Sequence, residues 1–129
     1  MNFWRVCSSS IRNVELALEF KTWGFPPLWA KYCQRVRRGD KVVIYTSANH
    51  SFIVICEVTK EYFVDNSPIW PDDEYPHRIG MEPLPVSQKP VGLKDVRAKR
   101  PKFGGSFMPA IVRLTPEDFN ILLSMMTEK

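Results

Sequence analysis

The sequence has few of the residues that build metal sites. It contains two histidines and three cysteines among 129 residues, and no Cys-x-x-Cys pair occurs. A structural zinc site needs four such ligands, usually in closely spaced pairs. The zinc-deaminase signature, His-x-Glu followed by Pro-Cys-x-x-Cys, is also missing. We therefore expect this chain to bind neither a metal nor a cofactor.

The cysteines are too few and too far apart to form a disulfide framework. Cys7, Cys33 and Cys56 each lie in or beside an apolar run, which predicts buried free thiols. Free thiols are typical of a reducing compartment, so we expect a cytoplasmic protein. No apolar run approaches the roughly 18 residues of a membrane span, and the first residues lack a secretory signal. No membrane association is expected.

Motifs of the common enzyme classes are missing as well. The sequence has no Gly-x-Ser-x-Gly elbow, P-loop or dinucleotide fingerprint. A run of carboxylates at residues 72–74 lies in a proline-rich stretch, where it is most simply solvent-facing. We expect no enzymatic activity. A small enzyme acting on a nucleotide or RNA, with Cys7, Asp65 or Arg78 in the chemistry, stays open as the less favoured alternative.

What the sequence does contain is enough apolar residues for one domain over residues 1–129. Apolar residues make up 44% and charged residues 25%, a balance typical of soluble globular proteins. Apolar runs rich in β-branched and aromatic residues predict strands. The short polar link at residues 48–51 predicts an antiparallel hairpin. The predicted strands cover residues 3–7, 42–47, 52–58, 78–81 and 110–114.

Helix signals complete the expected fold. Ser10 or Asn13 can cap a short helix, and residues 28–36 repeat apolar side chains at helical spacing. Thr115, followed by Pro116, begins a closing helix. The two prolines of residues 23–27 predict a rigid loop there, and residues 62–75 and 85–102 are expected to be irregular. This order predicts an α+β fold with a mainly antiparallel sheet curled into a small barrel.

The charge of the chain is mildly positive. A net charge of +4 allows attraction to phosphate but does not require it. Two clusters, in residues 31–41 and 94–102, carry much of the positive charge. They can equally be solvated surface without a partner.

Aromatic residues gather in or next to the loops and strand ends. A base or another flat ligand stacks on such rings with about 1–3 kcal/mol per base, although most rings in a domain of this size pack in the core. Trp23 stands out because it lies between a helix end and two prolines, a rigid position from which to present a ring. The candidates are Trp23, Phe25, Tyr45, Tyr62, Phe63, Trp70 and Tyr75.

Several segments of the sequence form a pattern through their order and spacing. They are the opening strand that ends at Ser8, the Trp23-Gly24-Phe25-Pro26 turn, residues 36–45 with Gly39-Asp40 and Tyr45, Tyr75-Pro76-His77-Arg78, Gly104-Gly105, and the helix start at Thr115-Pro116-Glu117-Asp118. Together they resemble the EVE domain, a branch of the PUA-like superfamily, and in particular its small stand-alone prokaryotic members. One departure is Ile55, where many members have glycine.

The resemblance implies a PUA-like fold, a mixed and mainly antiparallel β-barrel with flanking short helices and a C-terminal helix. It also implies a non-catalytic nucleic-acid-binding module that recognises a modified, methylated base flipped into an aromatic pocket. Carried over by position, the residues of that pocket are Ser8, Trp23, Phe25, Tyr45 and Trp70.

The basic clusters would then hold the nucleic-acid backbone, through Arg37, Arg38, Lys99 and Arg100. The expected partner is DNA or RNA that carries a modified base. A protein-interaction adaptor, with the aromatic residues as binding hot spots, stays open as the alternative function.

Overall fold

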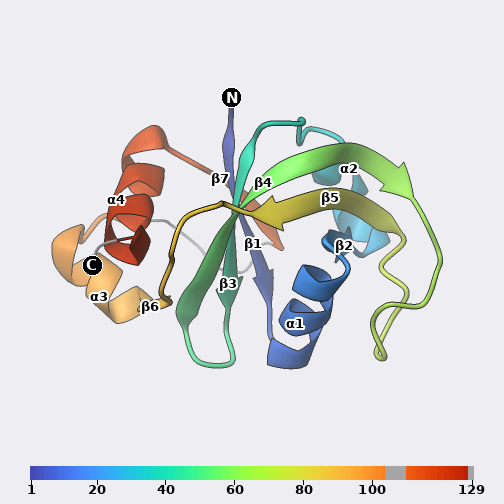
Figure 1. Cartoon of the computed structure of the whole chain (residues 1–129), viewed down its shortest axis with the longest axis horizontal. Coiled ribbons are helices and arrows are strands. Elements are labelled where there is room, and N and C mark those ends of the chain that lie inside the picture. Colours follow the sequence, from blue (N-terminus) through green and yellow to red (C-terminus); the bar gives the residue numbers. More distant parts are fainter. Residues whose placement is uncertain (104–109, 128–129) are drawn as a thin grey trace.

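A computed structural model describes residues 1–103 and 110–127, so the expected Gly104-Gly105 turn lies outside the described residues. One sheet runs through the molecule, and helices cover both of its faces (Figure 1). The strands are β1 Phe3–Ser8, β2 Thr22–Phe25, β3 Lys41–Thr46, β4 Ser51–Val64, β5 His77–Pro83, β6 Val91–Gly92 and β7 Ile111–Leu114. The helices are α1 Ile11–Glu19, α2 Ala30–Cys33, α3 Leu93–Lys99 and α4 Pro116–Thr127.

The sheet is mixed but mainly antiparallel, which confirms the predicted α+β class. Its strand order is β2-β5-β4-β3-β1-β7, with β6 paired to β4. Only β1 and β3 run parallel among the described pairings. No pairing within residues 1–103 and 110–127 joins β7 to β2, so the expected closed barrel is instead a curled, open sheet.

Alternation along the strands gives the sheet two separate cores. On β3, Val42 and Ile44 face the first core, on the side of α1 and β2, whereas Val43 and Tyr45 face the second core, on the side of α3 and α4. Successive side chains of a strand point to opposite faces. The hairpin of β3 and β4 joins both cores, and its antiparallel pairing confirms the prediction.

The predicted helix starts are confirmed. Ser10 caps α1, with its side chain accepting a hydrogen bond from the Asn13 amide at 3.1 Å. Thr115 Oγ1 accepts from the Asp118 amide at 3.1 Å at the start of α4. In both cases a side-chain oxygen satisfies an amide of the first helical turn that has no partner within the helix. No helix in the described ranges is both long and apolar enough to span a membrane.

Three local expectations were wrong. Residues 22–25 form the edge strand β2 rather than a loop, because the two prolines follow it and leave its own amides free to pair with β5. The helix expected over residues 28–36 is only α2 behind one 3-10 turn, Pro27–Trp29. The polar stretch after residue 85 contains α3, which buries a single residue, Val96, and so has too weak an apolar stripe to be recognised.

Candidate ligand-binding cavity

A cavity of about 220 Å³ lies where β1 ends, between α1, β2 and the loop that connects β4 to β5. Clefts that hold drug-sized molecules usually measure about 300–1,000 Å³, so this one suits a smaller ligand. Its lining combines aromatic rings with short polar side chains. The lining residues are Cys7, Ser8, Ser9, Ser10, Asn13, Trp23, Gly24, Phe25, Pro26, Trp70, Asp72, Tyr75 and Ala110.

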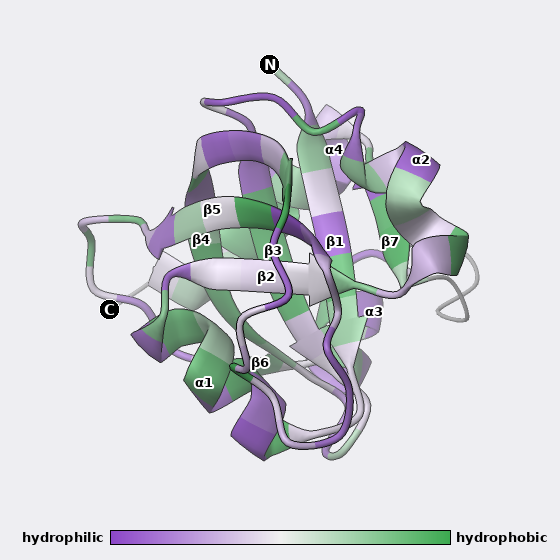
Figure 2. Ribbon diagram, turned by 90° about the vertical axis from the view of Figure 1, so that its right-hand side faces the viewer, coloured by the Kyte–Doolittle hydropathy of each residue, from purple (hydrophilic) through white to green (hydrophobic). Residues whose placement is uncertain are grey.

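The inner wall of the cavity comes from β2. Trp23 and Phe25 are 5% and 0% exposed and belong to the first core. They reach the cavity because β2 is an edge strand, paired on one side to β5 (Figure 2). Both rings are therefore fixed by packing, and of the two only Trp23 leaves a small part of its surface uncovered for a ligand.

The opposite wall comes from the β4–β5 loop, residues 65–76. Trp70 is 8% exposed, and its Nε1 donates a hydrogen bond to the Asn13 carbonyl oxygen at 3.1 Å. Tyr75 meets the Trp70 ring edge-on, with 5.5 Å between the ring centroids. This T-shaped contact is the arrangement that the charge distribution of two rings favours. The loop thus places two aromatic rings, each held in a fixed orientation, at the mouth of the cavity.

Glycine at position 24 allows the two walls to meet. A Cβ atom on Gly24 would lie 2.6 Å from Tyr75 Cβ and 2.7 Å from the Trp70 ring. Contacts below 3.0 Å between such atoms do not occur without displacement. The Trp-Gly pair of the sequence therefore has a structural reason, because the glycine lets the loop rings pack directly on the backbone of β2.

Arg78 holds the β4–β5 loop in place. It lies on β5, is 1% exposed, and donates hydrogen bonds to the carbonyl oxygens of Ser67, Glu74 and Tyr75 at 2.6, 3.0 and 3.1 Å. Its guanidinium also lies 5.2 Å from the centroid of the Trp70 ring. A buried cation needs such partners, and the loop carbonyls need donors. One side chain thereby fixes the whole loop that forms the outer wall.

The rim of the cavity carries a carboxylate, Asp72. Its two oxygens accept hydrogen bonds from Tyr75 Oη at 2.6 Å and from Asn13 Nδ2 at 2.9 Å. The Tyr75 hydrogen bond, followed by that of Asn13, lowers the pKa of Asp72. Burial, helped by the nearby Asp72, raises the pKa of Tyr75 to about 12. At neutral pH the rim therefore holds an ionised carboxylate beside a neutral phenol.

The remaining lining offers little chemistry for turnover. Burial raises the pKa of Cys7, so the thiol is not an activated nucleophile. Neither histidine is among the lining residues. Residues 1–103 and 110–127 contain no group of three or more His, Cys, Asp or Glu side chains that could hold a metal ion. What the lining offers is aromatic surface on which a flat ring can stack, beside side chains that can hydrogen-bond to its edge.

Four of the five predicted pocket residues line the cavity, namely Ser8, Trp23, Phe25 and Trp70. Tyr45 does not. It is 2% exposed in the second core, where its ring packs against Phe52 and its hydroxyl lies 3.1 Å from His50 Nδ1. Because side chains alternate along β3, Tyr45 points to the face opposite Ile44 and away from the cavity.

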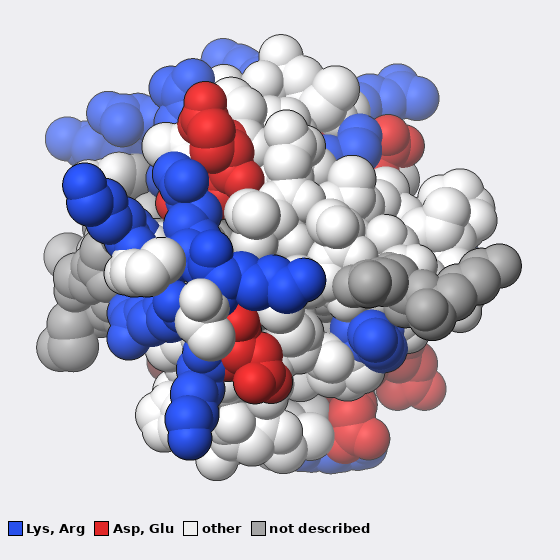
Figure 3. Space-filling view, turned by 90° about the vertical axis from the view of Figure 1, so that its left-hand side faces the viewer, with Lys and Arg blue, Asp and Glu red and all other residues white. Residues whose placement is uncertain are grey.

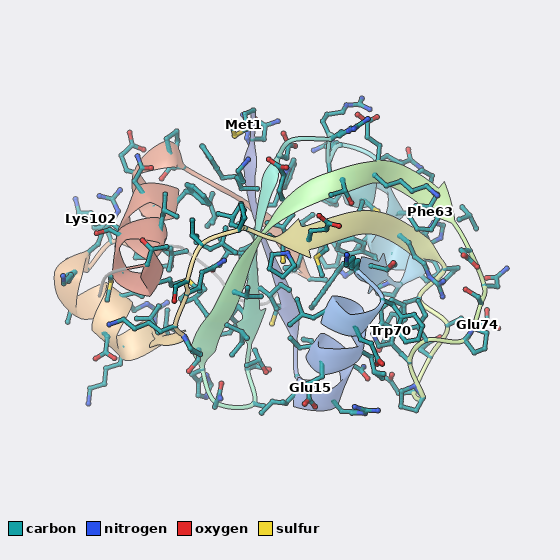
Figure 4. The ribbon with its side chains drawn as sticks, in the orientation of Figure 1. Met1, Glu15, Phe63, Trp70, Glu74 and Lys102 are labelled. Carbon is teal, nitrogen blue, oxygen red and sulfur yellow. The ribbon has the colours of Figure 1, made fainter. Side chains whose placement is uncertain are left out.

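None of the four basic residues expected to contact a nucleic-acid backbone lines the cavity. Arg37 pairs with Glu61 and Arg100 with Asp118. Arg97, Lys99 and their neighbours on α3 contribute to a basic surface on the α3–α4 side (Figure 3). Lys102 lies near one end of the long axis of the molecule, whereas Trp70 lies in the other half (Figure 4).

Three residues that shape the cavity are not among the predicted pocket residues. They are Asn13, a predicted helix cap, Gly24, which the sequence places in a turn, and Asp72, whose carboxylate is exposed, as expected, and also lines the cavity. Tyr75 was among the aromatic candidates but not among the chosen five. The long irregular segment was the available signal, because loops of that length are often functional.

Similarity to one known protein family extends over most of the chain. The sequence model of the EVE domain matches residues 8–125. The UPF0310 protein PH1033 of Pyrococcus horikoshii is 28% identical over 95% of this chain and 97% of its own length. The UPF0310 protein PYRAB08750 of Pyrococcus abyssi is 26% identical over 98% of this chain and all of its own.

Solved structures with a similar fold include YTH domains. The YTH domain of the Zygosaccharomyces rouxii MRB1 protein, solved in complex with N6-methyladenosine RNA, has a TM-score of 0.77 at 14% identity and covers 98% of this chain and 87% of its own. The protein Atu2648 of Agrobacterium tumefaciens has a TM-score of 0.68 at 17% identity and covers 100% of this chain and 97% of its own. At these identities the similarity shows a shared fold.

Proposed function

The chain belongs to the EVE domain family, and we propose that it is a nucleic-acid-binding module that takes one modified base into the cavity between β2 and the β4–β5 loop. The modification is a methyl group, the nucleic acid is RNA in the first instance, and the protein binds without turnover. The observation that carries this proposal is the aromatic cavity itself, because its volume of about 220 Å³ suits a ligand no larger than one base.

Three features of the cavity support a base as its occupant. The rings of Trp70, Tyr75 and Trp23 border it, and bases of every kind stack on such rings. The hydroxyl of Ser8, the amide of Asn13 and the carboxylate of Asp72 stand at its edge, where they can hydrogen-bond to a base. Arg78 and Gly24 hold the rings in place before a ligand arrives, which lowers the entropy lost on binding.

The fold similarity is consistent with this proposal. The YTH domain of Zygosaccharomyces rouxii MRB1 was solved with N6-methyladenosine RNA, and the Pho92 YTH domain was solved with m6A. A methylated base in single-stranded RNA is accessible because it can leave the stack at modest cost. A base that binds in the cavity of this chain would leave the stack in the same way.

The phosphate backbone would run over the exposed basic side chains. Arg37, Arg38, Lys99 and Arg100 are the proposed contacts, and they are set apart from the cavity. A strand that reaches them would therefore cross the surface rather than wrap the cavity mouth. Such contacts add affinity that weakens steeply with salt and carries no sequence information.

Blocking the cavity tests the proposal without disturbing the core. Ser9 is exposed and lines the cavity, so Ser9→Trp places a ring in the space for the base. The matched control is Ser87→Trp, an exposed serine outside the lining. Fluorescence anisotropy with methylated and unmethylated oligonucleotides of one sequence measures both variants.

We expect Ser9→Trp to lose the preference for the methylated oligonucleotide, by tenfold or about 1.4 kcal/mol, while Ser87→Trp keeps it. Equal binding of the methylated oligonucleotide by both variants, at unchanged melting temperatures, would contradict the proposal. Binding that barely changes with salt would instead favour a protein partner.

A further inference from the structure

We propose that the base recognised by this cavity is positively charged, an alkylated cationic base such as N1-methyladenine rather than a neutral methylated base. This inference rests on the proposed function and narrows its ligand. The lining carries one negative charge and several aromatic rings, and both favour a cationic ligand over a neutral ring of the same size.

The charge of the lining is negative. Asp72 is the one Asp, Glu, Lys or Arg among the described residues that border the cavity. Its hydrogen-bond donors, Asn13 Nδ2 at 2.9 Å and Tyr75 Oη at 2.6 Å, are both neutral groups. They orient the carboxylate and leave its charge uncancelled. A cationic ligand would supply the opposite charge that the rim lacks.

The aromatic walls favour the same ligand. A cation is attracted to the face of a tryptophan or tyrosine ring when it lies within about 6 Å of the ring centroid. Trp70, Tyr75 and Trp23 all border the cavity. The Trp70 ring already shows this affinity, because the Arg78 guanidinium lies 5.2 Å from its centroid.

The positive charge of Arg78 does not cancel the negative charge of the Asp72 carboxylate. It is absent from the lining, and Asp65 lies 3.6 Å from its guanidinium. Its other contacts are carbonyl and hydroxyl oxygens of the loop. The Arg78 guanidinium therefore pairs with groups of the β4–β5 loop, and the carboxylate of Asp72 is available to a cationic ligand.

The loop next to the rim also constrains the path of a nucleic acid. Asp73 and Glu74 follow Asp72 in the sequence, and all three carboxylates are exposed, so phosphates placed beside them would be repelled. The strand would enter and leave on the opposite side, over Ser8 and Ser9, where the lining is neutral. Only the base itself would then approach the carboxylate, and a cationic base gains most from that approach.

Two methyl isomers of adenine separate charge from shape. N1-methyladenine is protonated and cationic at neutral pH and N6-methyladenine is neutral, while both have the same number and kind of heavy atoms. The probes are short single-stranded RNAs of one sequence that contain N1-methyladenosine, N6-methyladenosine or adenosine at one position. Affinities are measured at neutral pH by fluorescence anisotropy for the wild type, Asp72→Asn and Asp73→Asn.

We expect the N1-methyl RNA to bind at least about fivefold more tightly than the N6-methyl RNA. Asp72→Asn should remove that difference between the two RNAs. Its melting temperature, compared with that of the wild type, is the folding control. Asp73→Asn removes the same charge from an exposed neighbour outside the lining and should keep the difference.

The other outcomes overturn the inference in distinguishable ways. Tighter binding of the N6-methyl RNA, or equal losses in Asp72→Asn and Asp73→Asn, would remove the cationic ligand and leave the proposed function standing. No preference for either methylated RNA over adenosine would remove both. A trimethyl-lysine peptide that binds in place of RNA and competes at the same cavity would show a protein partner instead.

Discussion

On one face of the sheet, α4 covers Tyr45 and Phe52 with a continuous apolar stripe, which includes the buried Phe119 and Leu122. On the other face, α1 covers only part of the first core, and the β4–β5 loop completes the cover. Both faces use aromatic rings, and Phe3 stacks on Phe119 with 4.2 Å between centroids. The α4 face is packed, whereas the loop-covered face contains the cavity.

The two faces differ because a helix and a loop satisfy their backbone hydrogen bonds in different ways. A helix bonds its own backbone internally and can give one whole side to packing. A loop must find partners for its carbonyl and amide groups, and here a buried arginine supplies several of them. The loop therefore touches the sheet at a few anchored rings and leaves a gap between them. That gap is the candidate binding site.

The largest effect is expected on the packed face. Phe119→Ala removes a ring that is 4% exposed and stacked on Phe3, which should lower the free energy of unfolding by about 3–5 kcal/mol. Ligand binding by the fraction that stays folded should not change, because the cavity lies on the other face. Chemical denaturation and an oligonucleotide titration measure the two quantities. A loss of affinity in the folded fraction would mean that the two faces are coupled.

The loop-covered face should be weakened next by Arg78→Met. The substitution leaves loop carbonyls without donors, and we expect a loss of about 3 kcal/mol in the free energy of unfolding. Faster proteolysis within residues 65–76 and loss of oligonucleotide binding should accompany it. Arg113→Met is the control, because Arg113 is exposed and donates to Asn2 at the surface. Similar stability losses in the two variants would rule out the anchoring role of Arg78.

The smallest of these effects is expected from Gly24→Ala. The new methyl group would force the Trp70 and Tyr75 rings outward, at about 1–3 kcal/mol, and would distort the cavity. In Gly92→Ala the added atom meets nothing nearer than 3.5 Å, so that variant should be nearly neutral. Thermal melting and oligonucleotide titration compare the pair. Wild-type affinity in Gly24→Ala would show that the rings need no fixed position.

Much of the fold could be predicted from the sequence because its signals are local. The β3–β4 hairpin has a short polar link between two apolar runs, and the caps of α1 and α4 are single side chains that act on the next turn. β2 was missed because its pairing with β5 joins residues more than fifty positions apart. An edge strand of four residues has no local pattern that records its partner.

The site was predictable only in part, and Tyr45 shows why. A strand position assigns a residue to one of two faces, and neither spacing nor composition says which face will carry a cavity. Trp23 was chosen for its rigid surroundings, and the structure places it at the cavity wall. Asp72 gains its position from hydrogen bonds to Asn13 and Tyr75, and contacts across 59 positions cannot be inferred from one sequence.

A crystal structure of the protein with a short RNA that contains one methylated adenosine tests the central claim most directly. The methylated base should lie in the cavity beside Trp70 and Trp23, with its edge toward Asp72 and its phosphates on the side of Ser8. A base held elsewhere, for example on the basic surface of α3, with the cavity unoccupied by the RNA, would contradict the assignment of this cavity as the recognition site.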